Sequence, residues 1–197
     1  MVSQKISKTI GIMNRLKNTL PNDVLQIIYY SLVLPYLNYG ILVWGCKCQN
    51  LSILQKRSVR LIVGEKYNAH TEPIMKFLKL LKVSDILKRE EIRFIYKLHN
   101  KLLPKYFINE MLVTNSQYHD YETRHRDDLR VPLGSHLFTN NIIRYRVPDI
   151  SNDLPDEIKD KLFTHGYQGF STFVKNFIID KYKADCHIEN CPICRRS

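Results

Sequence analysis

Residues 49–64 read QNLSILQKRSVRLIVG. Apolar side chains recur in this stretch at intervals of three and four residues, the spacing that places them on one face of an α-helix. We therefore predict a helix over residues 49–63 and expect Gly64 to end it, because glycine readily adopts the left-handed conformation that closes many helices. The side chains expected to face the interior are Leu51, Leu54, Leu61 and Ile62.

The same predicted helix carries three cations, Lys56, Arg57 and Arg60. Spacings of three and four residues make both Lys56 and Arg57 neighbours of Arg60 on the helix surface. Adjacent like charges lower the stability of a helix, and a polyanionic partner would relieve the repulsion. A basic face that is simply solvated is the alternative interpretation.

Helical patterns also precede this stretch. Residues 6–20 carry apolar side chains at helical spacing, and Pro21 ends that run. Asn22 or Asp23 can cap the next helix, and a further helix is predicted from Pro35 to Trp44. The first of these helices also presents the basic residues Lys8, Arg15 and Lys17.

Downstream of Gly64 the chain continues as helices and then changes character. Helices are predicted over residues 71–81 and 84–100, the second with Ser84 as its N-cap. Residues 113–128 form a polar segment rich in Tyr and His, which we predict to be a long loop.

The last third of the chain mixes two patterns. Two short, weakly alternating runs, at residues 129–132 and 142–147, are expected to pair as a small β-ribbon. Helical spacing returns at residues 156–163 and 171–182. The predicted fold is therefore mainly α: a helical bundle, followed by a smaller helical region with a long loop and this ribbon.

The composition of the 197 residues is that of a globular protein, with 44% hydrophobic and 25% charged residues. No run of 18 apolar residues predicts a membrane span, so we expect no membrane partner. The first residues lack the apolar core of a secretory signal. We therefore expect a nuclear or cytoplasmic protein that is not secreted.

Positive charge is concentrated in the first half of the chain. The net charge is +11; residues 1–105 hold 18 basic and 6 acidic residues, whereas residues 106–197 hold 12 basic and 13 acidic ones. A field of this sign suits a polyanion such as nucleic acid or an anionic membrane surface.

No catalytic constellation is evident in the sequence. It contains no glycine-rich phosphate loop, no Gly-x-Ser-x-Gly elbow and no His-Glu-x-x-His pair. Asp127 and Asp128 are adjacent, as are some metal-binding aspartates of polymerases, but they follow basic residues in a polar segment rather than apolar strands. We predict that the chain is not an enzyme and has no catalytic residue.

The cysteines near the C-terminus suggest a metal site. Cys191 and Cys194 have the Cys-x-x-Cys spacing that directs two thiolates at one tetrahedral zinc ion, and Cys186 or His187 can supply a third ligand. A zinc knuckle formed from Cys186, His187, Cys191 and Cys194 is one interpretation, and an unstructured reduced tail is another. A redox function is disfavoured because thiol oxidoreductases place this motif within a βαβ unit.

Several blocks of the sequence resemble one family. The segments SKTIGIMNRLK (7–17), YSLVLPYLNYGI (30–41), VWG (43–45) and LQKRSVRLI (54–62) are similar to the thumb region of LINE-type, jockey-like non-LTR retrotransposon reverse transcriptases. Further downstream, Thr123-Arg124, Leu129-Arg130 and Pro132 resemble a signature of the same C-terminal regions. Leu154-Pro155, Phe173-Val174-Lys175 and the cysteine cluster resemble its ending.

This resemblance implies a particular organisation and function. Residues 1–64 would be a thumb-like basic bundle, residues 65–182 a C-terminal helical region, and residues 183–197 a possible zinc-knuckle tail. A thumb grips template–primer nucleic acid (RNA, DNA or their hybrid) by its backbone, which positions the duplex without reading its sequence. The residues expected to do so are Lys8, Arg15, Lys17, Lys56, Arg57, Arg60, Arg124, Arg126 and Arg130.

Other functional interpretations remain open from the sequence. Tyr118 and Tyr121 can stack on bases, or they can pack as ordinary aromatic residues. The family's palm motif Ala-Asp-Asp and its endonuclease are absent, so the chain resembles a non-catalytic fragment of an RNA-directed DNA polymerase. The alternative is a helical protein-interaction or scaffold module, one of whose partners would be the polymerase palm, or a non-functional transposon remnant.

Overall fold

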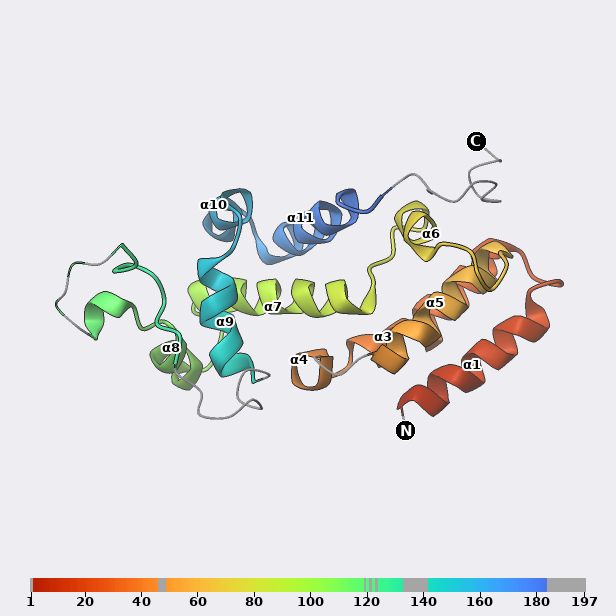
Figure 1. Ribbon diagram of the computed structural model, residues 1–197, viewed down its shortest axis with the longest axis horizontal. Helices are drawn as coiled ribbons and strands as arrows, with labels where there is room; N and C mark the ends of the chain where they lie inside the picture. The colour runs from red at the N-terminus through yellow and green to blue at the C-terminus, as the bar shows by residue number, and fades with distance from the viewer. Residues whose placement is uncertain are drawn as a thin grey trace. The chain divides into compact units, whose positions relative to one another are not determined.

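The computed structural model describes residues 2–45, 49–118, 120, 122, 124–132 and 142–183. Within these residues the fold is mainly α, as predicted, and contains helices but no strand (Figure 1). Contacts divide the chain into two compact units: Met1–Leu87 with Asn176–Ser197, and Lys88–Lys175. Two long helices, α7 (Val83–His99) and α11 (Tyr167–Asp180), contribute residues to both units.

The remaining helices each lie within one unit. The first unit contains α1 (Val2–Leu16), α2 (Asn22–Leu32), α3 (Leu34–Asn38), α4 (Ile41–Trp44), α5 (Gln49–Val63) and α6 (Thr71–Phe77). The second contains α8 (Lys105–Met111), the 3₁₀ helix η2 (Asn115–Gln117), α9 (Ile143–Asn152) and α10 (Asp156–Thr164).

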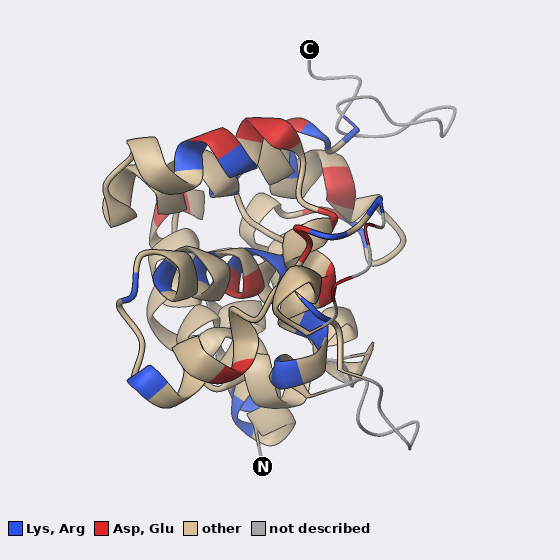
Figure 2. Ribbon diagram, turned by 90° about the vertical axis from the view of Figure 1, so that its left-hand side faces the viewer, with Lys and Arg blue, Asp and Glu red and all other residues tan. Residues whose placement is uncertain are grey.

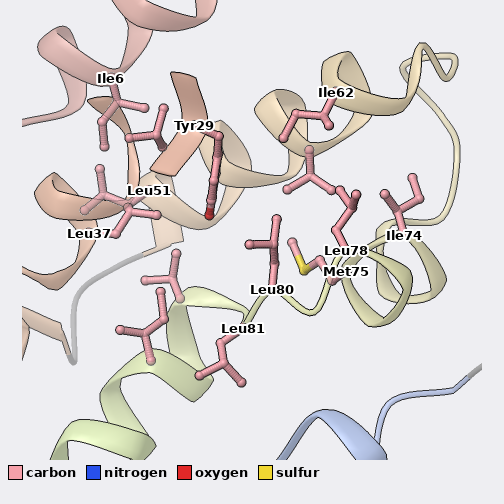
Figure 3. Packing of buried hydrophobic residues seen from close by; sticks show 14 of the residues in the cluster. Ile6, Tyr29, Leu37, Leu51, Ile62, Ile74, Met75, Leu78, Leu80 and Leu81 are labelled. Atoms are coloured by element: carbon pink, nitrogen blue, oxygen red, sulfur yellow. The ribbon is translucent and has the colours of Figure 1, made fainter. Parts of the chain in front are cut away.

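The first unit encloses a hydrophobic core that α5 helps to form. Helix α1 packs along α5, and side chains of α2, α3, α6 and the segment before α7 also belong to the cluster (Figure 3). Leu51 and Ile62 of α5 are buried, whereas Leu54 and Leu61 are partly buried against the same core. The interior face predicted for residues 49–63 is therefore confirmed in part, since Gln55, Ser58 and Val59 are buried as well.

A polar side chain lies in the middle of this core. The Nε2 of Gln55 donates hydrogen bonds to the Tyr29 hydroxyl at 2.9 Å and to the Leu81 carbonyl at 2.8 Å. Its Oε1 accepts a hydrogen bond from the Val83 amide at 2.9 Å. Gln55 is only 1% exposed, so these partners satisfy groups that water does not reach. One amide therefore links α5 to α2 and to the start of α7.

Helix α7 starts differently from the sequence prediction. It begins at Val83, one residue before the expected cap, so Ser84 lies within the first turn. The Val83 amide, one of the donors that a helix start leaves without an intrahelical partner, bonds to Gln55 of another helix. The residue that caps this helix start lies on another helix, so no local sequence motif predicts the interaction.

Two glycines with positive φ set helix ends in the first unit. Gly64 has φ of 71° and ends α5, as predicted. Its amide donates to the Leu61 carbonyl and the Glu65 amide donates to the Arg60 carbonyl, the paired bonds of a Schellman ending. Gly40, with φ of 64°, divides the helix predicted from Pro35 to Trp44 into α3 and α4.

The compact units do not coincide with the segments 1–64 and 65–182 expected from the sequence. Ile74 and Met75 of α6, with Leu78 and Leu81 after it, belong to the same core cluster as α5. The first unit therefore extends to Leu87, because residues that follow Gly64 fold back onto the helix that precedes it.

The C-terminal end of α11 is also attached to the first unit. The Tyr182 hydroxyl donates to the Asp85 carboxylate and accepts from the Lys82 amide at 2.9 Å. The Lys76 ammonium donates to the Tyr182 carbonyl at 2.7 Å. Burial, followed by the hydrogen bond to Asp85, raises the pKa of Tyr182, so the hydroxyl stays protonated.

The second unit combines aromatic packing with a buried ion pair. The rings of Tyr96 and Phe170 lie 4.7 Å apart between centroids, and the Tyr96 hydroxyl donates to the His165 carbonyl at 2.7 Å. Glu91, buried on α7, pairs with Arg146 of α9 at 2.6 Å. These contacts join α7 to α9 and to the start of α11 within this unit.

The β-ribbon predicted for residues 129–132 and 142–147 is wrong. Residues 143–152 form α9, which buries Val147, Pro148 and Ser151 at helical spacing. Leu129 instead forms an isolated antiparallel bridge with Thr114. An alternating run of six residues is too short to distinguish a strand from a helix, and the contacts of α9 favoured the helix.

The glycine at the end of α5 gives a stability test. We expect Gly64→Ala to lower the free energy of unfolding by about 1 kcal/mol, because an L-residue is strained in the left-handed region. An added Cβ at Gly64 would meet no atom within 4 Å, so the effect would be conformational rather than steric.

The matched control is Gly11→Ala within α1, where an added Cβ also meets nothing. Because alanine favours helix interiors, we expect this substitution to increase the free energy of unfolding by roughly 0.5–1 kcal/mol. Urea unfolding followed by circular dichroism measures both changes. Equal effects of the two substitutions would contradict the assigned conformations.

The buried amide gives a second test. We expect Gln55→Leu to lower the free energy of unfolding by about 3 kcal/mol, because it leaves the Leu81 carbonyl and the Val83 amide buried without their partner. Tyr29→Phe removes a single hydrogen bond and should cost about 1 kcal/mol. A Gln55→Leu variant no less stable than Tyr29→Phe would show that the network does not hold the core together.

Candidate nucleic-acid interface

The outward face of α1 carries two of the predicted cations. Ile6, Ile10 and Met13 mark the buried stripe of this helix. Lys8 and Arg15 are exposed, and their positions lie on the opposite side of the helix. Lys17, just beyond the last residue of α1, is exposed as well.

The outward face of α5 carries two more of the predicted cations. Its buried positions, which centre on Gln55, direct Lys56 and Arg57 to solvent, and both side chains are exposed. Within the described part of the chain, no carboxylate forms an ion pair with any of the exposed cations of this unit that the sequence singled out. These are Lys8, Arg15, Lys17, Lys56 and Arg57.

Arg60 has a different role from its neighbours. Its Nε donates a hydrogen bond to the Ala69 carbonyl at 2.8 Å, and the side chain is half-buried. Burial lowers the pKa of Arg60 from its ordinary value, although a guanidinium stays protonated in proteins. Arg60 therefore ties α5 to the segment 64–70 and leaves Lys56 and Arg57 as the free cations of this face.

In the second unit, the polar segment predicted as a long loop is closed by backbone hydrogen bonds. The Arg130 amide donates to the Val113 carbonyl at 2.8 Å, and the Asn115 amide donates to the Asp128 carbonyl at 3.1 Å. The side chain of Asn152 on α9 then bonds both the amide and the carbonyl of Leu129, at 2.9 and 2.8 Å. The two ends of the segment are thereby held together and against α9.

Of the three arginines predicted in and just after this segment, two have partners within the unit. Arg126 pairs with Glu122 at 3.2 Å, and the Arg130 guanidinium lies 3.2 Å from the centroid of the Tyr118 ring. Arg124 is exposed. Tyr118 is 63% exposed, so it is not packed in a core, and Tyr121 lies outside the described residues.

The two units differ in charge. The first contains 16 basic and 7 acidic residues, and the second 14 basic and 12 acidic ones. Helix α10 of the second unit carries charges of both signs along its ribbon (Figure 2). Nine of the eleven net positive charges therefore lie in the first unit, and the exposed cations on α1 and α5 make those helices the stronger candidate interface.

The predicted zinc ligands Cys186, His187, Cys191 and Cys194 all lie outside the described residues. Among the residues that are described, no group of three His, Cys, Asp or Glu side chains is placed to hold a metal ion. The zinc knuckle remains a prediction. Asp128 accepts a hydrogen bond from His125 Nδ1 at 2.6 Å, which is an exposed local pair.

Sequence reasoning overlooked the segment that follows α5. Residues 64–70 place Lys66 and Tyr67 in exposed positions next to the helix end that Arg60 fixes. The available signal was an aromatic residue beside a lysine in a short polar stretch.

Comparisons with known proteins add no relative: no protein-family model, no curated protein and no solved structure matches this chain. Among the described residues, no helix combines the length and apolar character needed to cross a membrane.

The Asn152 side chain provides a test of the second unit's segment. We expect Asn152→Ala to speed hydrogen exchange of the Leu129 amide about tenfold, because that amide loses its acceptor and the segment loses its attachment to α9. Exchange measured by NMR at single amides gives the result. Asn18→Ala, at an exposed position, serves as the control. Unchanged exchange at Leu129 in the Asn152 variant would contradict the attachment.

Proposed function

We propose that this chain binds template–primer nucleic acid through the basic outward faces of α1 and α5, as a non-catalytic segment of a LINE-type reverse transcriptase. The observation that carries the proposal is the set of exposed cations without carboxylate partners in the described part of the first unit. The family assignment rests on the sequence blocks alone, and two of those blocks, residues 7–17 and 54–62, contain these cations.

The expected chemistry is backbone recognition. Lysine and arginine side chains that neutralise phosphates release condensed counterions, which gives affinity that falls steeply with salt. Such contacts position a duplex without reading its bases. Because Lys56 and Arg57 project from a helix whose opposite face is fixed in the core, their position relative to α1 is set before any ligand binds.

A protein-interaction module is the second candidate. Tyr39 and Val43, next to the break between α3 and α4, are 81% and 86% exposed. A contiguous exposed apolar patch marks a protein contact, and these two side chains would form part of a patch that faces the palm of a polymerase. Both functions can reside in one unit, because these side chains and the cations lie on different helices.

The binding test compares two charge-matched variants by fluorescence anisotropy with an RNA/DNA hybrid duplex. We expect Lys56→Gln with Arg57→Gln to weaken binding about tenfold or more at 0.1 M salt and to reduce the log–log salt slope by about two. The control, Lys101→Gln with Lys105→Gln, removes the same charge from exposed positions in the second unit.

Arg60 is left unchanged because it holds the segment 64–70. A wild-type chain that fails to bind at low salt would rule out the proposed function. Equal losses in the two double variants would show that net charge, rather than the face of α5, attracts the nucleic acid.

A further inference from the structure

Tyr67 is the most exposed aromatic side chain in the described part of the first unit, at 90% exposure. Within the described residues its ring contacts no other aromatic ring and no cation. A large ring held in water is unfavourable, since burying such a side chain stabilises a protein or a complex by roughly 1.5–3 kcal/mol. The ring is therefore available to a partner.

The backbone beneath Tyr67 is held in place at both ends. The Ala69 amide donates to the Lys66 carbonyl at 3.1 Å, which closes a turn with Tyr67 and Asn68 as its two central residues. On one side, the Schellman ending at Gly64 joins the turn to α5. On the other, the Arg60 guanidinium holds the carbonyl of Ala69, a buried residue. The ring therefore stands on an ordered support.

This support adjoins the free cations of α5. Lys56 and Arg57 lie one helical turn before Arg60 on the same surface. About 10 Å of helix axis separate Arg57 from Gly64, at 1.5 Å per residue. A stacked strand advances about 3.4 Å per nucleotide, so this distance corresponds to about three nucleotides. A strand with its phosphates at Lys56 and Arg57 would therefore extend to the end of α5, where the turn that carries Tyr67 begins.

From this placement we propose that Tyr67 is a base-stacking residue, and that the preferred ligand is a nucleic acid with an unpaired or terminal base beside the duplex held by α5. The inference rests on the proposed function and adds the ligand's class. Stacking requires a free base face, which bases inside a continuous duplex do not offer. Base–aromatic stacking contributes about 1–3 kcal/mol per base and tolerates any sequence.

The side chains that flank Tyr67 favour nucleic acid over an apolar peptide as the ligand that contacts its ring. Lys66 precedes Tyr67 and is exposed, as are Asn68 and His70 after it. Glu65 is the single carboxylate in the segment 64–70. An aromatic ring among cations and neutral polar groups suits a base with its phosphates, whereas a peptide-binding groove needs contiguous apolar surface.

The test compares two RNA/DNA hybrids of equal length. The overhang substrate has a five-nucleotide single-stranded overhang that carries 2-aminopurine. The closed substrate has both ends closed by loops that contain no base. We expect Tyr67→Ala to weaken binding of the overhang substrate about tenfold and to abolish quenching of the 2-aminopurine. Its salt slope should stay unchanged, because no phosphate contact is lost. Binding of the closed substrate should not change.

Two further variants make the result specific. Tyr67→Phe keeps the ring and should bind like wild type. Phe77→Ala removes another aromatic ring of the same unit, 79% exposed, and should also bind like wild type. Because both positions are exposed, thermal unfolding should match wild type in all variants.

The inference and the proposed function fail in distinguishable ways. If Tyr67→Ala binds the overhang substrate as wild type does while the double variant at Lys56 and Arg57 is weakened, stacking is overturned and backbone binding stands. Tyr67 would then be assigned to a protein contact. Equal losses for the overhang and closed substrates would also overturn stacking. If wild type binds neither substrate, both proposals fall.

Discussion

The side-chain amide of Gln55 is the interaction on which the first unit depends. It lies in an apolar core, yet all three of its hydrogen bonds are made to buried groups on α2 and at the start of α7. Because an amide has fixed donor and acceptor ends, the three bonds together restrict the rotation of α5 about its axis. They add a directional constraint to the apolar contacts of the core.

That rotation has a direct consequence for the opposite face of the helix. With Gln55 fixed inward, Lys56 and Arg57 must point outward, and Arg60 lies where its guanidinium reaches the Ala69 carbonyl. The same core therefore orients the free cations and supports the turn that carries Tyr67. Burial of one face and exposure of charge on the other therefore come from a single packing arrangement.

Much of the first unit follows from local pattern. The period of the apolar residues predicted α1, α2 and α5, and Gly64 ends α5 as expected because its positive φ suits glycine. Other features needed the fold. The start of α7 depends on Gln55, a residue 28 positions away, rather than on Ser84. In the second unit, the run 142–147 resembled a strand, but Arg146 pairs with buried Glu91 and Val147 is buried, which together favour α9.

The sequence by itself determined the helical character of this chain, the grouping of Lys56, Arg57 and Arg60 on one helix, and the excess of positive charge in its first half. These are consequences of spacing and composition. Only the tertiary structure decided that Arg60 is a tie rather than a free cation, that Arg130 lies against Tyr118, and that Tyr67 stands exposed on an ordered turn. The reason is that these features depend on contacts with residues outside the helix itself. The spacing of apolar residues along one helix does not show which residues will pack against it.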